Sequence, residues 1–260
     1  MKNLIPHKWS LVMKIFPLVV GVLLTKLLFH SMGWEYISVN SLFTSIISAN
    51  VFLLGFLLAG TLSDYKESER IPGELAASME TIADECAITY KHKKAKEAKA
   101  CLHYVAELNT MIQGWLHKKV KTNDLLQKVT GLNDFYLAFE SITQPNFIVR
   151  LKQEQNSIRR FLIRIHTIRE TSFVAVGYAI AELTTALLII GFIIAKIDPF
   201  YESIFFVGIA AFLMMYMIAL IKDLDNPFDY YEGEKESAHV SLTPLIDLED
   251  RLHDKLKSLK

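Results

Sequence analysis

Four long apolar segments with very little charge limit most strongly what this chain can fold into. A helix needs about 20 mostly apolar residues to cross a bilayer. The segments that meet this requirement are residues 10–28, 37–62, 172–195 and 203–221. The first contains Lys14 and Lys26 near its ends, where a long side chain can reach the membrane interface. We therefore expect an all-α membrane protein with four transmembrane helices in two hairpins.

The positive charges outside these segments predict an orientation. The short connections 31–36 and 197–202 contain no Lys or Arg, whereas residues 63–171 contain many. Short loops without positive charge are typical of the external side. We expect a multi-pass protein of the cell membrane, with both termini and a long helical segment in the cytoplasm. The expected parts are a first hairpin (1–62), a cytosolic helical region (63–171), a second hairpin (172–221) and a cytosolic tail (222–260).

Composition and motifs exclude several functions. The 28 Lys and Arg balance the 28 Asp and Glu, and a zero net charge argues against nucleic-acid binding. Cys86 and Cys101 are too few for a disulfide framework or a Cys-rich zinc site, and we expect them to fill space between helices. No phosphate loop, nucleophile elbow or zinc-protease motif occurs. We expect no catalytic residues and no metal ligands, with membrane lipid as a partner.

The region between the hairpins is predicted to form long helices. Residues 74–110 lack Gly and Pro and are rich in good helix formers. Within them Leu75, Met79, Ile82 and Cys86 recur at spacings of three and four, which predicts one buried stripe. Further helices are expected near 123–141, from 147 toward the third span, and from about Thr243 in the tail. Because the tail is acidic and the middle region slightly basic, we expect the tail to dock on it.

The second span has one face unlike the others. Steps of four residues place Thr44, Ser48, Phe52 and Phe56 together, so the face is rich in hydroxyls at one end and aromatic at the other. One interpretation is that small polar residues help helices to pack. The other is a water-filled vestibule that narrows into a hydrophobic constriction. One chain of four spans is too small to enclose such a pore, so the second interpretation requires a ring of identical subunits.

Charges near this span are candidates for ion selection. In a ring, Asp64 and Glu67 would repeat around the axis; the alternative interpretation, which we favour, is ordinary interfacial charge. Glu182 lies within the third span, where an ionisable residue is costly. It either contacts ions or is held structurally by Lys14, Lys26 or Tyr178. A basic group in the cytosolic region is either a solvated face or a surface that attracts anions; it consists of Arg159, Arg160 and Arg164.

Two motifs resemble the bestrophin family of ion channels. The run from Phe52 to Phe56, FLLGF, followed by LLAGTLSDYKESERIPGE, resembles the second span of bestrophins. The run Asn226-Pro227-Phe228 before an acidic stretch resembles their "NPFG" segment. The resemblance implies a homopentamer that passively conducts small ions, with anions such as chloride favoured over cations. It places Phe52 and Phe56 in the pore neck.

The sequence also departs from the family. Ser48 stands where bestrophins often have a branched aliphatic residue, and the run after the neck is Ser63-Asp64-Tyr65. Asp229 replaces the Gly of "NPFG", and the acids that follow are sparse for a cation that takes about six to eight oxygen ligands. The sequence therefore does not indicate calcium or any other cofactor. The alternative function is a membrane-anchored interaction or sensory module whose cytosolic helices bind a partner.

Overall fold

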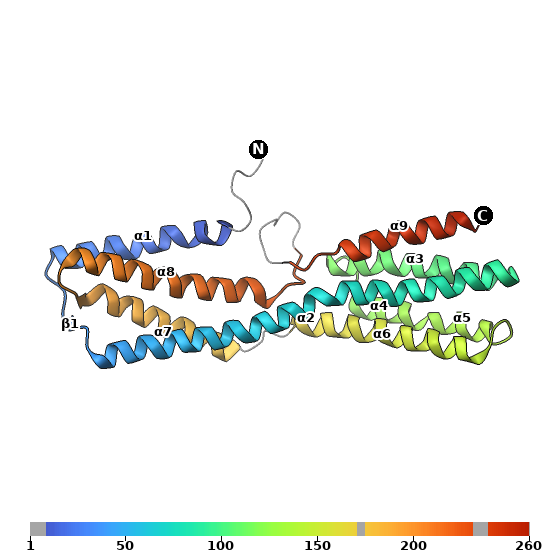
Figure 1. The fold of residues 1–260 in the computed structure, drawn as a ribbon, viewed down its shortest axis with the longest axis horizontal. Helices are drawn as coiled ribbons and strands as arrows, with labels where there is room; N and C mark the ends of the chain where they lie inside the picture. The colour runs from blue at the N-terminus through green and yellow to red at the C-terminus, as the bar shows by residue number, and fades with distance from the viewer. Residues whose placement is uncertain (1–8, 171–174, 231–238, 260) are drawn as a thin grey trace. The chain divides into compact units, whose positions relative to one another are not determined.

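The computed structural model describes residues 9–170, 175–230 and 239–259, and these are almost entirely helical (Figure 1). The chain divides into two compact units. The membrane unit holds the described residues 9–65 and 175–225, and the helical unit holds 66–170, 226–230 and 239–259.

The membrane unit contains four helices that are long and apolar enough to cross a membrane, as expected. Together with the fold, they support a membrane location. Its elements are α1 (Ser10–Ser31), β1 (Ile37–Ser38), the first part of α2 (Ser41–Lys93), α7 (Ala175–Ile194), β2 (Ala195–Lys196) and α8 (Phe200–Asp225). The predicted start of the third span, residues 172–174, lies outside the described residues.

The predicted start of the second span at residue 37 was wrong. Ile37 and Ser38 form strand β1, which pairs in parallel with β2, so that Ile37 lies opposite Ala195 and Ser38 opposite Lys196. Helix α2 begins only at Ser41, where Asn40 Oδ1 accepts a hydrogen bond from the Phe43 amide. The pairing of β1 with β2 joins the two connections within the hairpins by backbone hydrogen bonds.

The helical unit is built around one apolar core. Its helices are the rest of α2, α3 (Lys96–Leu116), α4 (Thr122–Thr130), α5 (Leu132–Phe139), α6 (Pro145–Glu170) and α9 (Thr243–Ser258). The predicted stripe is confirmed, because Leu75, Met79, Ile82 and Cys86 are all fully buried. Cys101 is buried with them, and both thiols are free.

The helix-favouring run 74–110 is interrupted near its middle. Helix α2 ends at Lys93, Lys94 adopts a left-handed backbone conformation with φ of 53°, and α3 begins at Lys96. The break allows the apolar faces of α2 and α3, including Cys86 and Cys101, to enter one core. Tertiary packing therefore overrides local helix propensity here.

The tail docks within the helical unit, but its charges are mostly opposite to those expected. Leu245, Leu248 and Leu252 of α9 are buried in the core. The bases Arg251 and Lys255 pair with Glu80 of α2 at 2.9 and 3.1 Å. Two interactions therefore hold α9 in place. Its leucines are buried in the core, and its basic side chains pair with an acidic side chain of the middle region.

Candidate functional site

The first part of α2 packs on the membrane unit through one side only. Leu54 and Leu57 are buried there in the apolar core, and Asn50 and Thr61 are buried on the same side. At 100° per residue, the predicted stripe lies on the opposite side of the helix. All four of its residues are exposed, with 77% exposure for Phe52 and 66% for Phe56. The membrane unit therefore leaves this face uncovered.

The hydroxyls of this face are satisfied by their own helix. Thr44 Oγ1 donates to the Asn40 carbonyl at 3.1 Å, and Ser48 Oγ donates to the Thr44 carbonyl at 3.0 Å. Ser45 makes the same kind of bond to Ser41 at 2.8 Å. A hydroxyl keeps its lone pairs free when it donates in this way. The face can therefore contact water or ions without help from a neighbouring helix.

A polar contact that our reading of the sequence missed joins α2 to α7. Asn50 is 3% exposed; its amide donates to Thr185 Oγ1 at 3.0 Å and accepts from Thr184 Oγ1 at 2.6 Å. The only signal for this contact in the sequence was an Asn within an apolar segment. Beside it, Phe43 packs edge-on against Phe192. These contacts orient α2, because they fix the side that packs and so the side that stays open.

Glu67 and Arg164, predicted to act in opposite directions, bind each other in the helical unit. The guanidinium donates two hydrogen bonds to the carboxylate, Nε to Oε1 at 2.9 Å and Nη2 to Oε2 at 2.7 Å. These bonds lower the pKa of Glu67. Each side chain thereby neutralises the charge of the other.

The other charged candidates are Asp64, Arg159 and Arg160. Asp64 is half-buried on α2. Arg159 donates to Thr130 Oγ1 and Arg160 to Ser157 Oγ, both at 3.2 Å. The structure therefore does not gather the three arginines around one anion-sized site.

Glu182 has a partner that we did not predict. Its carboxylate lies 2.5 Å from Nζ of Lys222, near the end of α8. The proposed partners Lys26 and Tyr178 are engaged elsewhere, since Lys26 binds Glu35 and the Tyr178 hydroxyl donates to Asp225 at 2.7 Å. The structural explanation for Glu182 thus fits the contacts, but with a different base.

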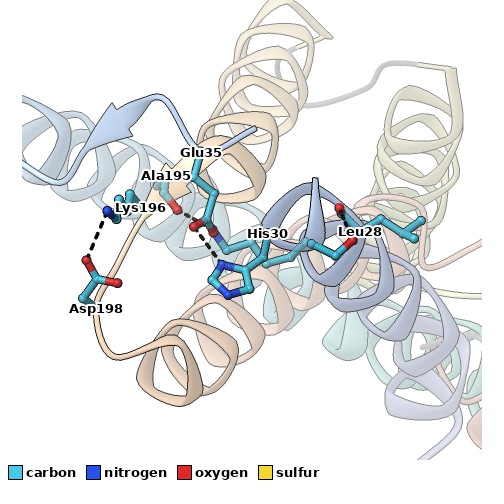
Figure 2. A network of polar contacts seen from close by, with 8 residues as sticks. Leu28, His30, Glu35, Ala195, Lys196 and Asp198 are labelled. Atoms are coloured by element: carbon cyan, nitrogen blue, oxygen red, sulfur yellow. Dashed lines mark hydrogen bonds and ion pairs between the residues drawn. The ribbon is translucent and has the colours of Figure 1, made fainter. Parts of the chain in front are cut away.

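Lys26, which was expected to reach the membrane interface, is held by the connections of the two hairpins. Its side chain is fully buried, and Nζ donates to Glu35 Oε1 at 2.5 Å and to the Ala195 carbonyl. Figure 2 shows Glu35 between His30 and Ala195, with His30 Nδ1 2.9 Å from Glu35 Oε2. Figure 2 also shows Lys196 and Asp198, which pair on the second connection. A buried ion pair thus ties the connections of the two hairpins together.

The residues considered for calcium have other partners where the structure describes them. Asp229 forms an ion pair with Lys118. Residues 231–234, which carry the following acids, lie outside the described residues. Among the residues that are described, no three His, Cys, Asp or Glu side chains are grouped to hold a metal ion.

Comparison with solved structures identifies the fold. A variant of a bacterial bestrophin homologue from Klebsiella pneumoniae superposes with a TM-score of 0.78 at 14% identity, covering 93% of this chain and 97% of that one. Another structure of the same homologue gives 0.74 at 13% identity, with 94% and 98% covered. No protein-family model and no curated protein matches the sequence. The chain has the fold of the bacterial bestrophin homologues.

Proposed function

We propose that this protein is a bestrophin-like ion channel, in which five copies surround a central pore lined by α2. The observation that carries the proposal is the uncovered face of α2 formed by Thr44, Ser48, Phe52 and Phe56. Conduction is passive, and the protein lies in the cell membrane with both termini in the cytoplasm.

A ring gives this face an environment that fits its chemistry. Five copies of α2 around one axis would enclose a passage with hydroxyls at one end and rings of Phe52 and Phe56 further along. Hydrophobic constrictions gate by excluding water. Ser48, with its polar side chain, would keep the approach to the Phe rings wet.

Anions such as chloride are favoured over cations in this proposal, because the ion pairs weaken the case for a cation pore. Glu67 is neutralised by Arg164 and Glu182 by Lys222, so two of the three candidate acids contribute no unpaired negative charge. Rings of acidic side chains favour cations in channels. With those acids paired, the main argument from this sequence for a cation pore is weakened.

Purified protein in planar bilayers tests the proposal. We expect currents, and we expect Phe52→Ala and Phe56→Ala to change conductance or gating because they remove the constriction. Phe16→Ala is the matched control, since Phe16 is an exposed Phe of α1, at 59%, away from the face. Five subunits in detergent are expected by mass measurement.

Two results would contradict the channel. One is the absence of current from the unmodified protein, and the other is a monomeric state. A soluble partner bound by the helical unit, in the absence of ion flux, would support the interaction module instead.

A further inference from the structure

An apolar groove of about 560 Å³ lies in the membrane unit between α2, α7 and α8. Every residue that lines it is apolar. Its walls include Phe43, Ile47 and Val51 of α2, Phe192 of α7, and Phe206 and Leu213 of α8. Phe206 is 57% exposed and Leu213 is 52% exposed, so the groove is open along α8.

The groove borders the proposed pore face on one side only. At 100° per residue, Ile47 and Val51 follow one edge of the Thr44–Phe52 stripe. The opposite edge carries a second apolar row, Leu42, Ile46 and Ala49, and all three are exposed. Helix α2 thus has an open groove beside one edge of its pore face and an uncovered apolar ridge along the other.

A ring requires two such surfaces to meet. Subunits related by rotation contact head to tail, so one surface of each copy meets a different surface of the next. If α2 is innermost, the edges of its pore face point toward the adjacent copies. We propose that the Leu42–Ile46–Ala49 ridge of one copy fills the groove between α2 and α8 of its neighbour. This inference rests on the proposed function.

Rotation about an axis along the membrane normal predicts which residues meet. Equivalent residues of all copies then lie at the same depth, so Ile46 of one copy is level with Ile47 of the next. Ile47 lines the groove together with Ile209 and Leu213 of α8. Ile46 should therefore approach Ile209 or Leu213 of the adjacent copy.

Disulfide trapping tests this contact in the full-length protein. A disulfide forms only between Cα atoms less than about 7 Å apart. Ile46→Cys combined with Leu213→Cys, or with Ile209→Cys, should give a ladder of covalent species ending at the closed ring after mild oxidation. The control combines Ile46→Cys with Leu24→Cys, an exposed residue of α1, and should give only background. The native Cys86 and Cys101 are buried in the helical unit and remain in all variants.

A second measurement separates a neighbouring subunit from a lipid chain in the groove. Brominated acyl chains quench the fluorescence of a tryptophan that they touch. The fluorescence that Phe206→Trp adds to that of the native tryptophans should be quenched several-fold less than the fluorescence that Phe16→Trp adds, since Phe206 lies in the groove and Phe16 has a similar exposure on α1. Equal quenching would show that lipid fills the groove and would overturn the inference.

The outcomes also distinguish the inference from the proposed function. A conducting ring of five copies that gives no cross-link with either α8 position leaves the channel intact and overturns this contact. A monomer without current overturns both. Cross-linking into a closed ring without any ion flux supports the contact and contradicts the channel.

Discussion

Lys26 of α1 and Glu35 of the following connection form a buried ion pair, with 2.5 Å between Nζ and Oε1. The Lys26 side chain has no exposed surface, and it also donates to the Ala195 carbonyl at the start of β2. His30 reaches the second oxygen of Glu35 and stacks on Phe200 with 3.7 Å between ring centroids. One lysine thus links α1, its connection and the connection between α7 and α8.

Replacing Lys26 with Met should strongly destabilise the membrane unit. The change leaves the carboxylate of Glu35 without its buried partner, and breaking a buried pair from one side costs about 3–5 kcal/mol. Thermal unfolding in detergent should show a clear fall in midpoint. The double variant Lys26→Met with Glu35→Gln should recover part of the loss, because it removes the unpaired charge.

Lys196→Met serves as the control for this experiment. Lys196 pairs with Asp198 at 3.7 Å, and both side chains are exposed. Exposed pairs contribute about 0–1 kcal/mol. Equal destabilisation by Lys26→Met and Lys196→Met would show that the buried pair has no special role.

Single and double charge reversals at the Glu67–Arg164 pair should have different effects on ion selectivity. Arg164→Glu removes the base that neutralises Glu67 and adds a further negative charge, so we expect reversal potentials under a salt gradient to shift toward cations. Glu67→Arg combined with Arg164→Glu restores a pair in the opposite direction and should return the potential toward that of the unmodified protein. Arg160→Glu is the control, since the Arg160 guanidinium donates to Ser157 and lies over the Phe161 ring, both on its own helix.

An unchanged reversal potential in Arg164→Glu would mean that this pair does not influence permeating ions. A shift in the Arg160→Glu control of the same size would point to a general effect of surface charge. In either case the open face of α2 would have to account for selectivity without Glu67.

The fold class and the core were predictable because they depend on local patterns. Spans follow from continuous hydropathy, and the Leu75–Cys86 stripe follows from the helical period. The exposed face of α2 was predictable for the same reason, since residues four apart share one side of a helix. Its role as a pore lining remains a prediction.

The pairings were not predictable because they join residues far apart in the chain. Lys26 reaches a carbonyl 169 positions away, and Asn50 binds a threonine 135 positions away. Glu182 pairs with Lys222, which was not among the predicted partners, because α7 and α8 run side by side. The break at Lys94 opposes local helix propensity and follows from the packing of α2 on α3.

Helix α9 should become less firmly docked at acidic pH. Burial raises the pKa of Glu80, but hydrogen bonds from Arg251 and Lys255 outweigh this effect and hold the pKa below its ordinary value. A lowered pKa in the folded state stabilises the fold above the ordinary value, and the contribution disappears as the pH falls through the lowered one. The protection factors of the α9 amides, in which the intrinsic pH dependence of exchange is divided out, should therefore be lower at about pH 3.5 than at pH 7.

The variant Glu80→Gln should make α9 exchange faster already at pH 7, because it removes the charge that both bases contact. Its cost should be about 1 kcal/mol, since the pair is partly exposed. Glu249→Gln is the control, because Glu249 accepts a neutral hydrogen bond from Gln113. The protection of α9 against hydrogen exchange should differ less between pH 3.5 and pH 7 in Glu80→Gln than in the unmodified protein. If that difference stayed the same, Glu80 would not be the titrating group.

Asn50→Ala should disturb both stability and conduction. It leaves Thr185 without a donor in a buried site, and an unsatisfied buried polar group costs about 1–3 kcal/mol. Because Asn50 fixes which side of α2 packs on α7, its loss should also broaden the single-channel conductance into several levels. Ser45→Ala is the matched control, since Ser45 is exposed and donates to a carbonyl of its own helix. A variant that loses stability but keeps one sharp conductance level would show that Asn50 holds the helices together without orienting the pore face.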